Sequence, residues 1–325
     1  MRRVIVTGAA GFIGFHLCRR LLREGFWVEG LDNLSSSSAL LLKEARLSIL
    51  KKDSAFSFHE IDICHKQKLR KFFEGPAKDA EYMFHLAAEV GVRDSIRFPA
   101  RYVSTNVRGF LHVLEGCRTL SLDRIFYASS SSVYGSNEKV PFSEEDVVNS
   151  PLSVYAATKL ANEHMASTYS SLYDIGLTGL RFFTVYGPYG RPDMALFKFV
   201  KAISEGREID LYLQGKMRRD FTYIDDVIES LFRLMLRKEV NSLHEIYNVG
   251  RGKPSLLRDF LSLIEEKMNK KAVKKFLPRQ KGDMLRTYAD TNHLRLAIDY
   301  VPNISMDTGV SSFLDWYFSF YHSKS

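Results

Sequence analysis

The sequence predicts an α/β protein with a doubly wound parallel sheet, followed by a smaller mixed region toward the carboxyl terminus. Short apolar segments of strand length alternate with helical segments as far as Gly187. A glycine-rich loop, residues 7–14, separates the first strand from the first helix. After Gly187 the alternation becomes irregular, and the proline, glycine and charge content indicates a different architecture. The 325 residues are enough for one large domain or two unequal ones.

The individual elements follow from apolar periodicity along the chain. Residues 3–7 form an apolar strand, and a helix with apolar residues at helical spacing then runs to Gly25. Residues 27–31 form the second strand, which ends at Asp32. Helices joining strands in this order favour a parallel sheet covered on both faces. Further strands are expected at residues 57–61, 82–86, 124–128 and 177–183.

Composition limits the classes of partner. Hydrophobic content of 45% and charged content of 26% are ordinary for a globular protein. The net charge of +8 is compatible with nucleic acid or with an acidic small substrate. Much of the excess lies in residues 267–281, which lack the interleaved aromatic residues that stack on single-stranded bases. We therefore expect an acidic small molecule and no nucleic acid.

Cysteine and histidine usage points to a reducing compartment and to no metal. The three cysteines are scattered and form no CxxC pair, so we expect a cytoplasmic protein. His59, Cys64 and His65 are the nearest approach to a ligand cluster, but their context is a strand end, and no metal is assigned. The glycine loop begins within seven residues of Met1, which leaves no room for a signal peptide. No apolar run approaches the length of a membrane span.

The glycine loop predicts a dinucleotide site. Gly8, Gly11 and Gly14 follow a strand and open a helix, where glycine permits a tight turn and close approach of a pyrophosphate to the helix N-terminus. Asp32 closes the second strand, where a carboxylate can bind both ribose hydroxyls. Asn33 follows, with no arginine nearby to receive a 2′-phosphate, so we expect NAD rather than NADP.

Tyr155 and Lys159 are candidates for acid–base chemistry. Four residues apart, they share one face of a helix, downstream of the serine run at residues 129–132. A phenol titrates near pKa ~10 and an ammonium near ~10.4. A cation beside the phenol favours the phenolate and so lowers the pKa of Tyr155. The spacing taken alone also fits an ordinary surface Tyr and Lys.

These residues together resemble the extended short-chain dehydrogenase/reductase family, whose members modify nucleotide sugars. The marks are residues 7–14, residues 85–88 (His-Leu-Ala-Ala), Asn106, residues 129–135 (Ser-Ser-Ser-Ser-Val-Tyr-Gly), and Tyr155 with Lys159. The resemblance implies a Rossmann-type fold and a homodimer formed through helices near residues 100–118 and 154–173. The cofactor-binding residues that it implies are Gly8, Gly11, Phe12, Ile13, Gly14, Asp32, Asn33, Asp62, Ile63, Leu86, Ala87, Ala88, Asn106, Tyr155 and Lys159.

Of these, Asp62 is a candidate for the adenine amino group, although an ordinary helix cap fits its position equally well. The resemblance also implies the chemistry. Ser130, with Ser131 as the alternative, would hydrogen-bond the sugar 4-hydroxyl. Tyr155 would take its proton while C4 gives hydride to NAD⁺, and Lys159 would hold the ribose.

The serine run argues against dehydration. The 4,6-dehydratases of the family carry Asp-Glu where this sequence has Ser131 and Ser132. Serine hydroxyls cannot replace an acid and carboxylate pair near neutral pH. The remaining reaction is reversible: oxidation at C4, turnover of the keto sugar, and return of hydride to the other face. The sequence therefore predicts a 4-epimerase.

A second signature is similar to the UDP-glucuronate 4-epimerases and extends over nearly the full length. It comprises residues 179–188, 190–195, 215–226, 282–283 and 287–290. The resemblance implies that Thr184 and Arg191 hold the sugar carboxylate, with Ser130, Ser131 and Ser132 nearby. A guanidinium matches a carboxylate bidentately, and a hydroxyl adds one donor. Arg219 would contact the diphosphate and Asp283 the uridine ribose, although Gln280-Lys281 departs from the usual pattern there.

The domain division and the alternatives complete the prediction. Residues 1–186, with a returning segment near 223–253, would form the NAD-binding domain, and residues 187–222 and 254–325 the sugar-nucleotide domain. A decarboxylase producing a UDP-pentose shares the first step. A 4-epimerase of a neutral UDP-hexose or UDP-N-acetylhexosamine would need a neutral pocket, against which Arg191 argues. A non-catalytic binding module would be expected to lack Tyr155 or Lys159.

Overall fold

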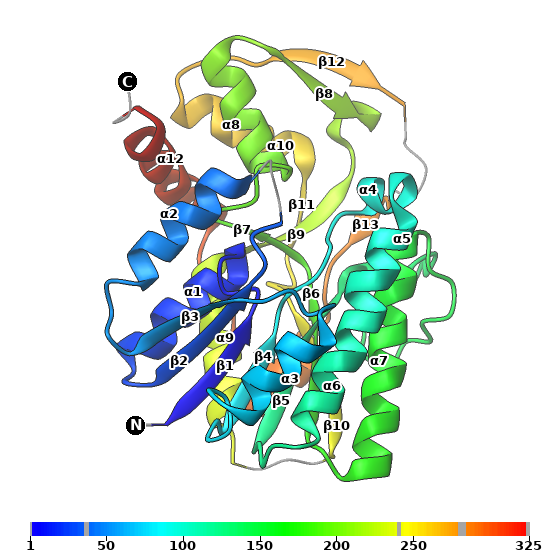
Figure 1. Ribbon diagram of the computed structural model, residues 1–325. Helices are drawn as coiled ribbons and strands as arrows, with labels where there is room; N and C mark the ends of the chain where they lie inside the picture. Colours follow the sequence, from blue (N-terminus) through cyan, green and yellow to red (C-terminus); the bar gives the residue numbers. More distant parts are fainter. Residues whose placement is uncertain (1, 36–38, 239–241, 279–283, 323–325) are drawn as a thin grey trace.

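The computed structural model describes residues 2–35, 39–238, 242–278 and 284–322. Within these residues seven parallel strands form one sheet in the order β10-β6-β5-β4-β1-β2-β3 (Figure 1). These strands are β1 (Arg3–Thr7), β2 (Trp27–Asp32), β3 (Phe56–Glu60), β4 (Tyr82–His85), β5 (Arg124–Ser130), β6 (Leu177–Phe182) and β10 (His244–Val249). The predicted parallel sheet is confirmed.

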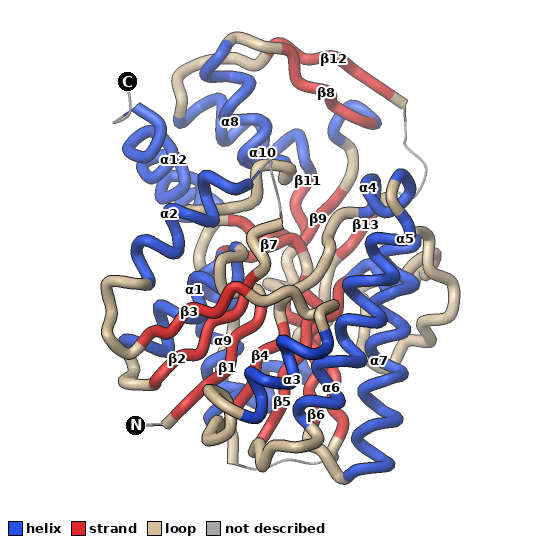
Figure 2. Tube along the Cα trace, in the orientation of Figure 1, coloured by secondary structure: helices blue, strands red, loops and turns tan. Residues whose placement is uncertain are grey.

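Both faces of the sheet are covered by helices (Figure 2). Successive residues of a strand point to opposite faces, so Val4 and Val6 pack on one side and Ile5 on the other. The side of Val4 and Val6 is covered by α1 (Phe12–Arg23) and α9 (Ile224–Leu236). The opposite side is covered by α3 (Lys66–Glu74), α6 (Phe110–Cys117) and α7 (Val154–Tyr173). Further elements of this half are α2 (Leu40–Leu50), α4 (Val92–Arg97), α5 (Pro99–Tyr102), the π-helix η2 (Val103–Gly109) and the 3₁₀ turn η3 (Ser131–Tyr134).

Most of the remaining elements form a smaller mixed region above the carboxyl ends of the strands (Figure 1). Its strands belong to a mixed sheet, in which β9 pairs with β7, β11 and β13, and to a parallel pair of β8 and β12. The strands are β7 (Thr184–Tyr186), β8 (Glu208–Tyr212), β9 (Arg218–Tyr223), β11 (Pro254–Leu256), β12 (Val273–Leu277) and β13 (Arg286–Thr287). The helices of this region are α8 (Ala195–Glu205), η4 (Leu213–Gly215), α10 (Leu257–Lys267) and α12 (Met306–His322), whereas α11 (Asn292–Ile298) packs against α9 and against β10 of the large sheet.

The chain crosses between the two regions more than once. After leaving the large sheet at β6 it forms β7 to β9 in the mixed region, then returns as α9 and β10 at the edge of the large sheet. The division into two domains at the predicted boundaries stays a prediction. No helix in the described residues has both the length and the apolar character needed to cross a membrane.

Candidate active site

The glycine loop has the geometry of a site for a pyrophosphate. Gly8 adopts a φ of +73°, and a Cβ on it would lie 2.8 Å from the amide nitrogen of Ala87. A Cβ on Gly14 would lie 2.1 Å from the carbonyl oxygen of Gly8, which is closer than any real contact. Gly11 caps helix α1 and has no side chain to occupy the first amides of that helix. The loop therefore presents backbone amides and a helix N-terminus, which fits a dinucleotide phosphate. Phe12 is buried and Ile13 is partly buried in the first turn.

Asp32 lies at the carboxyl end of β2, beside this loop. Its carboxylate accepts hydrogen bonds from the amides of Ala10 at 3.2 Å and Leu34 at 2.9 Å. The ammonium of Lys43, on α2, lies 2.7 Å from the same carboxylate. The carboxylate stands where a ribose is bound in dinucleotide sites of this type, so the residues present fit NAD.

The predicted adenine-side residues follow β3. The side-chain amide of Asn33 donates to one carboxylate oxygen of Asp62 at 3.0 Å, and the backbone amide of Cys64 donates to the other at 2.7 Å. Burial works to raise the pKa of Asp62, but these hydrogen bonds outweigh it and the pKa falls. Ile63 is buried, and its carbonyl oxygen lies 3.0 Å from Nδ1 of His112. Asn33, Asp62 and Ile63 thus form one rim next to Asp32.

Leu86, Ala87 and Ala88 form the start of the loop after β4, on the other side of the glycine loop. The amides of Leu86 and Ala87 donate to the carbonyl and hydroxyl oxygens of Thr7, at 3.1 and 3.2 Å. The hydroxyl of Thr7 also lies 2.8 Å from Nδ1 of His85. These bonds fix the loop against the end of β1, across the opening where a dinucleotide lies in such sheets.

Asn106 lies in the π-helix η2 and holds the same loop further along. Its side-chain oxygen accepts from the amide of Glu89 at 2.8 Å, and its side-chain nitrogen donates to the Glu89 carbonyl at 3.0 Å. The nitrogen also donates to the Thr158 hydroxyl at 3.1 Å. Asn106 therefore links the loop after β4 to helix α7.

Tyr155, Lys159 and Ser130 meet at the end of β5. Helix α7 begins after Ser153, whose hydroxyl accepts the amide of Ala156 at 3.1 Å. The Lys159 ammonium is buried and donates to the Ala128 carbonyl in β5 at 2.8 Å. This bond fixes the helix against the strand that ends in Ser130.

The electrostatics of Tyr155 differ from the sequence-based expectation. Burial raises the pKa of the Tyr155 phenol, while a hydrogen bond with Ser130 and the charge of Arg191 oppose this rise. The net direction is upward, opposite to the expected lowering by Lys159. Burial also lowers the pKa of Lys159 to about 8, against the charge of Glu163. Arg191 is the cation whose charge opposes the rise in the pKa of Tyr155, and the Lys159 ammonium donates to a backbone carbonyl.

The serines of the run point in different directions. Ser129 donates to the carboxylate of Glu163 at 2.6 Å, whereas the next residue, Ser130, is the serine that opposes the rise in the pKa of Tyr155. Ser131 and Ser132 lie in the turn η3, and the Ser132 amide donates to the Ser130 hydroxyl at 3.2 Å. Alternating side-chain directions along β5 separate Ser129 from Ser130. This geometry favours Ser130 over Ser131 as the residue next to the base.

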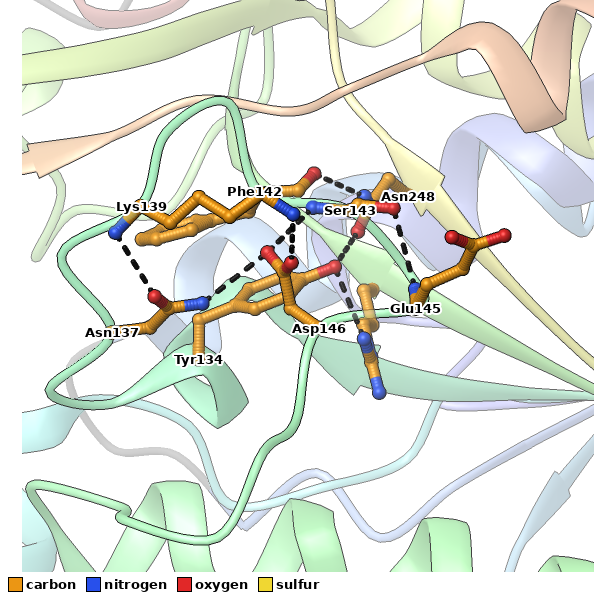
Figure 3. A network of polar contacts seen from close by, with 9 residues as sticks. Tyr134, Asn137, Lys139, Phe142, Ser143, Glu145, Asp146 and Asn248 are labelled. Atoms are coloured by element: carbon orange, nitrogen blue, oxygen red, sulfur yellow. Dashed lines mark hydrogen bonds and ion pairs between the residues drawn. The ribbon is translucent and has the colours of Figure 1, made fainter.

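A buried polar network lies behind these residues. The guanidinium of Arg181 binds Glu163 through two nitrogens at 2.9 and 2.8 Å, and both side chains are buried. Arg181 also donates to the Tyr134 hydroxyl at 3.0 Å, and Tyr134 donates to Asn248 at 2.6 Å (Figure 3). The network joins α7, β6 and β10 beneath Ser129 and Ser130.

Within the segment between η3 and α7, one carboxylate accepts several hydrogen bonds. Asp146 accepts from the Lys139 ammonium at 2.6 Å, the Asn137 amide at 3.2 Å and the Ser143 backbone amide at 2.9 Å (Figure 3). These bonds close the segment on itself between the serine run and Tyr155.

The predicted carboxylate-binding residues come from two adjacent places. Ser130 pairs with Phe182 in the large sheet, and Thr184 follows two residues later. Residues 187–193, called here the recognition loop, carry Arg191 between β7 and α8. A Cβ on Gly91 would lie 3.9 Å from Nη2 of Arg191 and 3.7 Å from the Tyr102 hydroxyl, and the ring centroids of Tyr102 and Tyr155 are 6.2 Å apart. Arg191 therefore lies in the neighbourhood of Tyr102 and Tyr155, and its charge opposes the rise in the pKa of Tyr155.

Arg191 already has a carboxylate partner. Its Nε and Nη2 atoms donate to the two oxygens of Asp193 at 3.0 and 2.5 Å. A guanidinium has a second edge for another carboxylate. Asp193 is therefore a neighbour of the site that the sequence analysis missed.

The predicted diphosphate and uridine residues are less closely described. Arg219 lies in β9, with Nη1 donating to the carbonyl of Arg218 at 2.9 Å. Phe221 lies two residues after Arg219 in β9 and pairs with Thr184 in β7. Arg219 and Thr184 therefore belong to the same sheet. Asp283 lies outside the described residues, as do Gln280 and Lys281. Their roles stay predictions.

The sequence analysis also missed His16, Lys43 and Arg46. All three lie on α1 or α2, next to the glycine loop. The one available signal was a pair of cations, Lys43 and Arg46, one turn apart in an otherwise largely apolar helix. Their partners are 11 to 172 residues distant in sequence, so no local pattern could have identified them.

The comparison with known families decides the relationship. The sequence profile of the NAD dependent epimerase/dehydratase family matches residues 4–250, which span the large sheet and its return through β10. The chain belongs to this family. The predicted relationship to NAD-dependent nucleotide-sugar epimerases is thereby confirmed.

Named relatives in this family cover the whole chain. A protein named probable UDP-glucuronate 4-epimerase from Rhizobium meliloti is 40% identical, over 97% of this chain and 96% of its own. A Bacillus cereus UDP-glucuronic acid 4-epimerase, solved with UDP-glucuronic acid and NAD, is 34% identical with a TM-score of 0.92. That match covers 98% of this chain and 100% of the other. A Thermotoga maritima UDP-glucose 4-epimerase, solved with UDP-glucose, is 29% identical over 98% and 99%, with a TM-score of 0.86.

Proposed function

We propose that this protein is an NAD-dependent UDP-glucuronate 4-epimerase, which interconverts UDP-glucuronate and UDP-galacturonate through a 4-keto intermediate. The observation that carries the proposal is the position of the Arg191 guanidinium, which lies near Gly91 and Tyr102 and whose charge opposes the rise in the pKa of Tyr155. A cation next to the base provides a partner for a sugar that carries a carboxylate close to its reacting carbon. The full-length similarity to the Bacillus cereus enzyme, solved with UDP-glucuronic acid and NAD, supports the same substrate.

The residues of the large sheet would hold NAD. The amides of the glycine loop and of the α1 N-terminus would bind its pyrophosphate, and Asp32 its adenosine ribose. When bound, NAD⁺ accepts a hydride from C4 of the sugar and later returns it, so the reaction has no net redox change. Lys159 would hold the second ribose from its place against β5.

Tyr155 moves the proton. The phenolate takes the proton of the 4-hydroxyl as C4 becomes a ketone, and the Ser130 hydroxyl holds the same oxygen. After the keto sugar has turned over, Tyr155 returns the proton and the 4-hydroxyl forms with opposite configuration. Burial makes the phenolate costly, and the Ser130 hydrogen bond and the Arg191 charge reduce that cost. All atoms and electrons are restored at the end of the cycle.

The carboxylate must be held for a chemical reason as well as for recognition. A ketone at C4 makes the sugar a β-keto acid, which loses CO₂ when the bond to the carboxylate stands perpendicular to the carbonyl plane. We propose that Thr184 and Arg191 fix a rotamer that avoids this alignment and so protect the intermediate. Arg219 and Asp283 would hold the diphosphate and the uridine ribose.

The test is incubation of the purified protein with UDP-glucuronate and catalytic NAD⁺, with the products resolved by NMR. UDP-galacturonate without net NADH supports C4 epimerisation. A UDP-pentose with CO₂ release would show a decarboxylase instead. Turnover of UDP-glucose or UDP-N-acetylglucosamine, with none of UDP-glucuronate, would show a neutral-sugar epimerase and a mistaken role for Arg191.

A homodimer is proposed through the helices beside the active site. Exposed apolar side chains occur on α4, η2, α6 and α7 and in the link between α4 and α5: Ile96, Phe98, Val103, Leu111 and Leu172. Large apolar side chains that are exposed together are typical of a protein interface. Sedimentation at micromolar concentration would show a dimer, and charged replacements at Val103 and Leu172 would dissociate it.

The setting of the reaction is also proposed. The described cysteines, Cys18, Cys64 and Cys117, are free thiols, which supports a cytoplasmic location. UDP-galacturonate is an activated glycosyl donor, so the next reaction would transfer the acidic sugar during polysaccharide synthesis.

A further inference from the structure

The recognition loop cannot hold its shape through local backbone preference. Gly187 has a φ of 149° and Tyr189 a φ of 56°, and a left-handed conformation is unfavourable for tyrosine. Within the loop the backbone bonds run from the Gly190 amide to Gly187 and from the Met194 amide to Arg191, at 3.0 and 3.2 Å. The loop that carries Arg191 therefore depends on contacts from elsewhere in the fold.

Two buried side chains of the NAD-binding half bind successive carbonyls of this loop. Nε2 of His16, on α1, lies 2.9 Å from the carbonyl oxygen of Pro188. Nη2 of Arg46, on α2, donates to the carbonyl oxygen of Tyr189 at 2.6 Å. His16 is 9% exposed and Arg46 is 2% exposed. Both donor residues are buried, and a buried donor that loses its hydrogen-bond partner costs free energy.

The protonation states agree with this arrangement. Burial lowers the pKa of His16 to about 3, so the imidazole is neutral near pH 7. A carbonyl oxygen only accepts, so the proton of the neutral ring lies on Nε2. Burial also lowers the pKa of Arg46, to about 10, which leaves the guanidinium charged.

Arg46 joins the two loops of the site. Its Nη1 atom donates to the Ala10 carbonyl, inside the glycine loop, at 2.7 Å, while Nη2 holds Tyr189. One rigid guanidinium thus sets the distance between the cofactor loop and the recognition loop. Its Nε atom has no hydrogen-bond partner in the described part of the chain. Two backbone carbonyls accept hydrogen bonds from this buried guanidinium.

The ring of Tyr189 is held as well. It packs 5.0 Å from the ring of Phe15 on α1 and 4.9 Å from that of Trp316 on α12. Figure 1 shows α1, α2 and α12 on the same side of the molecule. Three helices therefore fix the residue that lies two positions before Arg191.

We propose that His16 and Arg46 are positioning residues for carboxylate recognition, acting through the carbonyls of Pro188 and Tyr189 on Arg191. The proposal rests on the proposed function, because it assigns Arg191 to the sugar carboxylate. Release of either carbonyl shifts the guanidinium from its place beside Tyr155. A displacement of about 1 Å in a catalytic site lowers activity substantially.

The test compares ligands with and without the carboxylate. Calorimetry on NAD-loaded protein gives dissociation constants for UDP-glucuronate and for UDP in wild type, H16F, H16Q, R46M and R46K. H16F and R46M should weaken UDP-glucuronate about tenfold, which corresponds to about 1.4 kcal/mol, and UDP by less than about twofold. H16Q keeps a donor near the position of Nε2 and should restore discrimination, whereas R46K, with one nitrogen for two carbonyls, should restore it in part.

The control is L47A, which truncates a buried residue on α2 next to Arg46. It lowers stability and should leave the ratio of the two dissociation constants unchanged, whereas a general loss of structure would weaken both ligands together. If the wild type binds UDP-glucuronate more tightly than UDP, and H16F and R46M keep the same ratio of the two dissociation constants, the positioning role alone is overturned. A wild type that binds UDP-glucuronate no better than UDP overturns the proposed function and this role with it.

Discussion

The two sides of the active site are built in different ways. Ser130, Tyr155 and Lys159, called here the catalytic corner, lie on a strand end and a helix, fixed by Lys159 to Ala128 and by the Glu163–Arg181 pair beneath. The recognition loop lies between β7 and α8, outside both elements. Side chains from α1 and α2 make hydrogen bonds to its backbone carbonyls. The chemical groups are therefore placed by regular structure, and the specificity group by distant contacts. Damage to each side should have a different signature.

The largest effect is expected at the catalytic corner. Y155F removes the hydroxyl that transfers the proton, so kcat should fall at least about 100-fold and as much as about 10,000-fold. UDP-glucuronate binding and the melting temperature should stay near wild type. Y169F removes another hydroxyl on α7, bonded to Glu115, and should leave kcat unchanged. Comparable turnover in Y155F would remove Tyr155 from the mechanism.

The matching change in the recognition loop is R191A. Loss of the guanidinium should weaken UDP-glucuronate about 100-fold while UDP still binds, because a desolvated charge pair loses one partner. The same variant should release UDP-pentose and CO₂, since the carboxylate rotamer is no longer fixed. Product ratios by NMR measure this, and R207A, at an exposed arginine beyond the far end of α8, is the control. An inactive R191A that forms no pentose would contradict the protective role.

The foundation of the catalytic corner is tested by E163Q. Glu163 accepts from Arg181 and Ser129, and its neutralisation leaves a buried guanidinium without its counter-charge. The free energy of unfolding in urea should fall by about 3 kcal/mol. E115Q changes a half-exposed glutamate, paired with Arg118, and should change it by less than about 1 kcal/mol. Equal losses in the two variants would show that the buried pair has no special part in stability.

A smaller effect concerns the pH dependence of stability. The pKa of Lys159 is lowered to about 8 in the fold, against about 10.4 in an unfolded chain. Between these values the unfolded chain binds more protons, so stability rises with pH. From pH 8 to pH 10 the cofactor-free wild type should gain about 2 kcal/mol relative to K159M. Parallel unfolding curves for the two proteins would show an ordinary lysine.

The helices and strands were largely predictable because the spacing of apolar residues along the chain indicates them. Strands expected at residues 3–7, 124–128 and 177–183 are found at Arg3–Thr7, Arg124–Ser130 and Leu177–Phe182. The seventh strand, β10, was not predicted as a strand, only as part of a returning segment. It pairs with β6, 67 residues earlier at His244 and Leu177, and long-range pairing leaves no local signal.

The site divides in the same way. Motif spacing identified Tyr155, Lys159 and Ser130 as candidates, and in the structure they lie at the end of β5 and on the helix packed against it. The direction of the Tyr155 pKa could not be read from spacing, because burial is a property of the whole fold and outweighs the nearby charges. Asp193, at Arg191, was likewise missed, since a loop sequence does not state which side chains face one another.

The sequence by itself determined the α/β class, the NAD-type loop and the set of reactive groups, because these depend on residue identity and short spacings. Tertiary structure alone decided which cation acts on Tyr155 and how Arg191 is held. The hydrogen bonds of His16 to Pro188 and of Arg46 to Tyr189 join residues that are 172 and 143 positions apart in the sequence. Their acceptors are backbone carbonyls, which every residue carries, so only folding distinguishes these two from the rest.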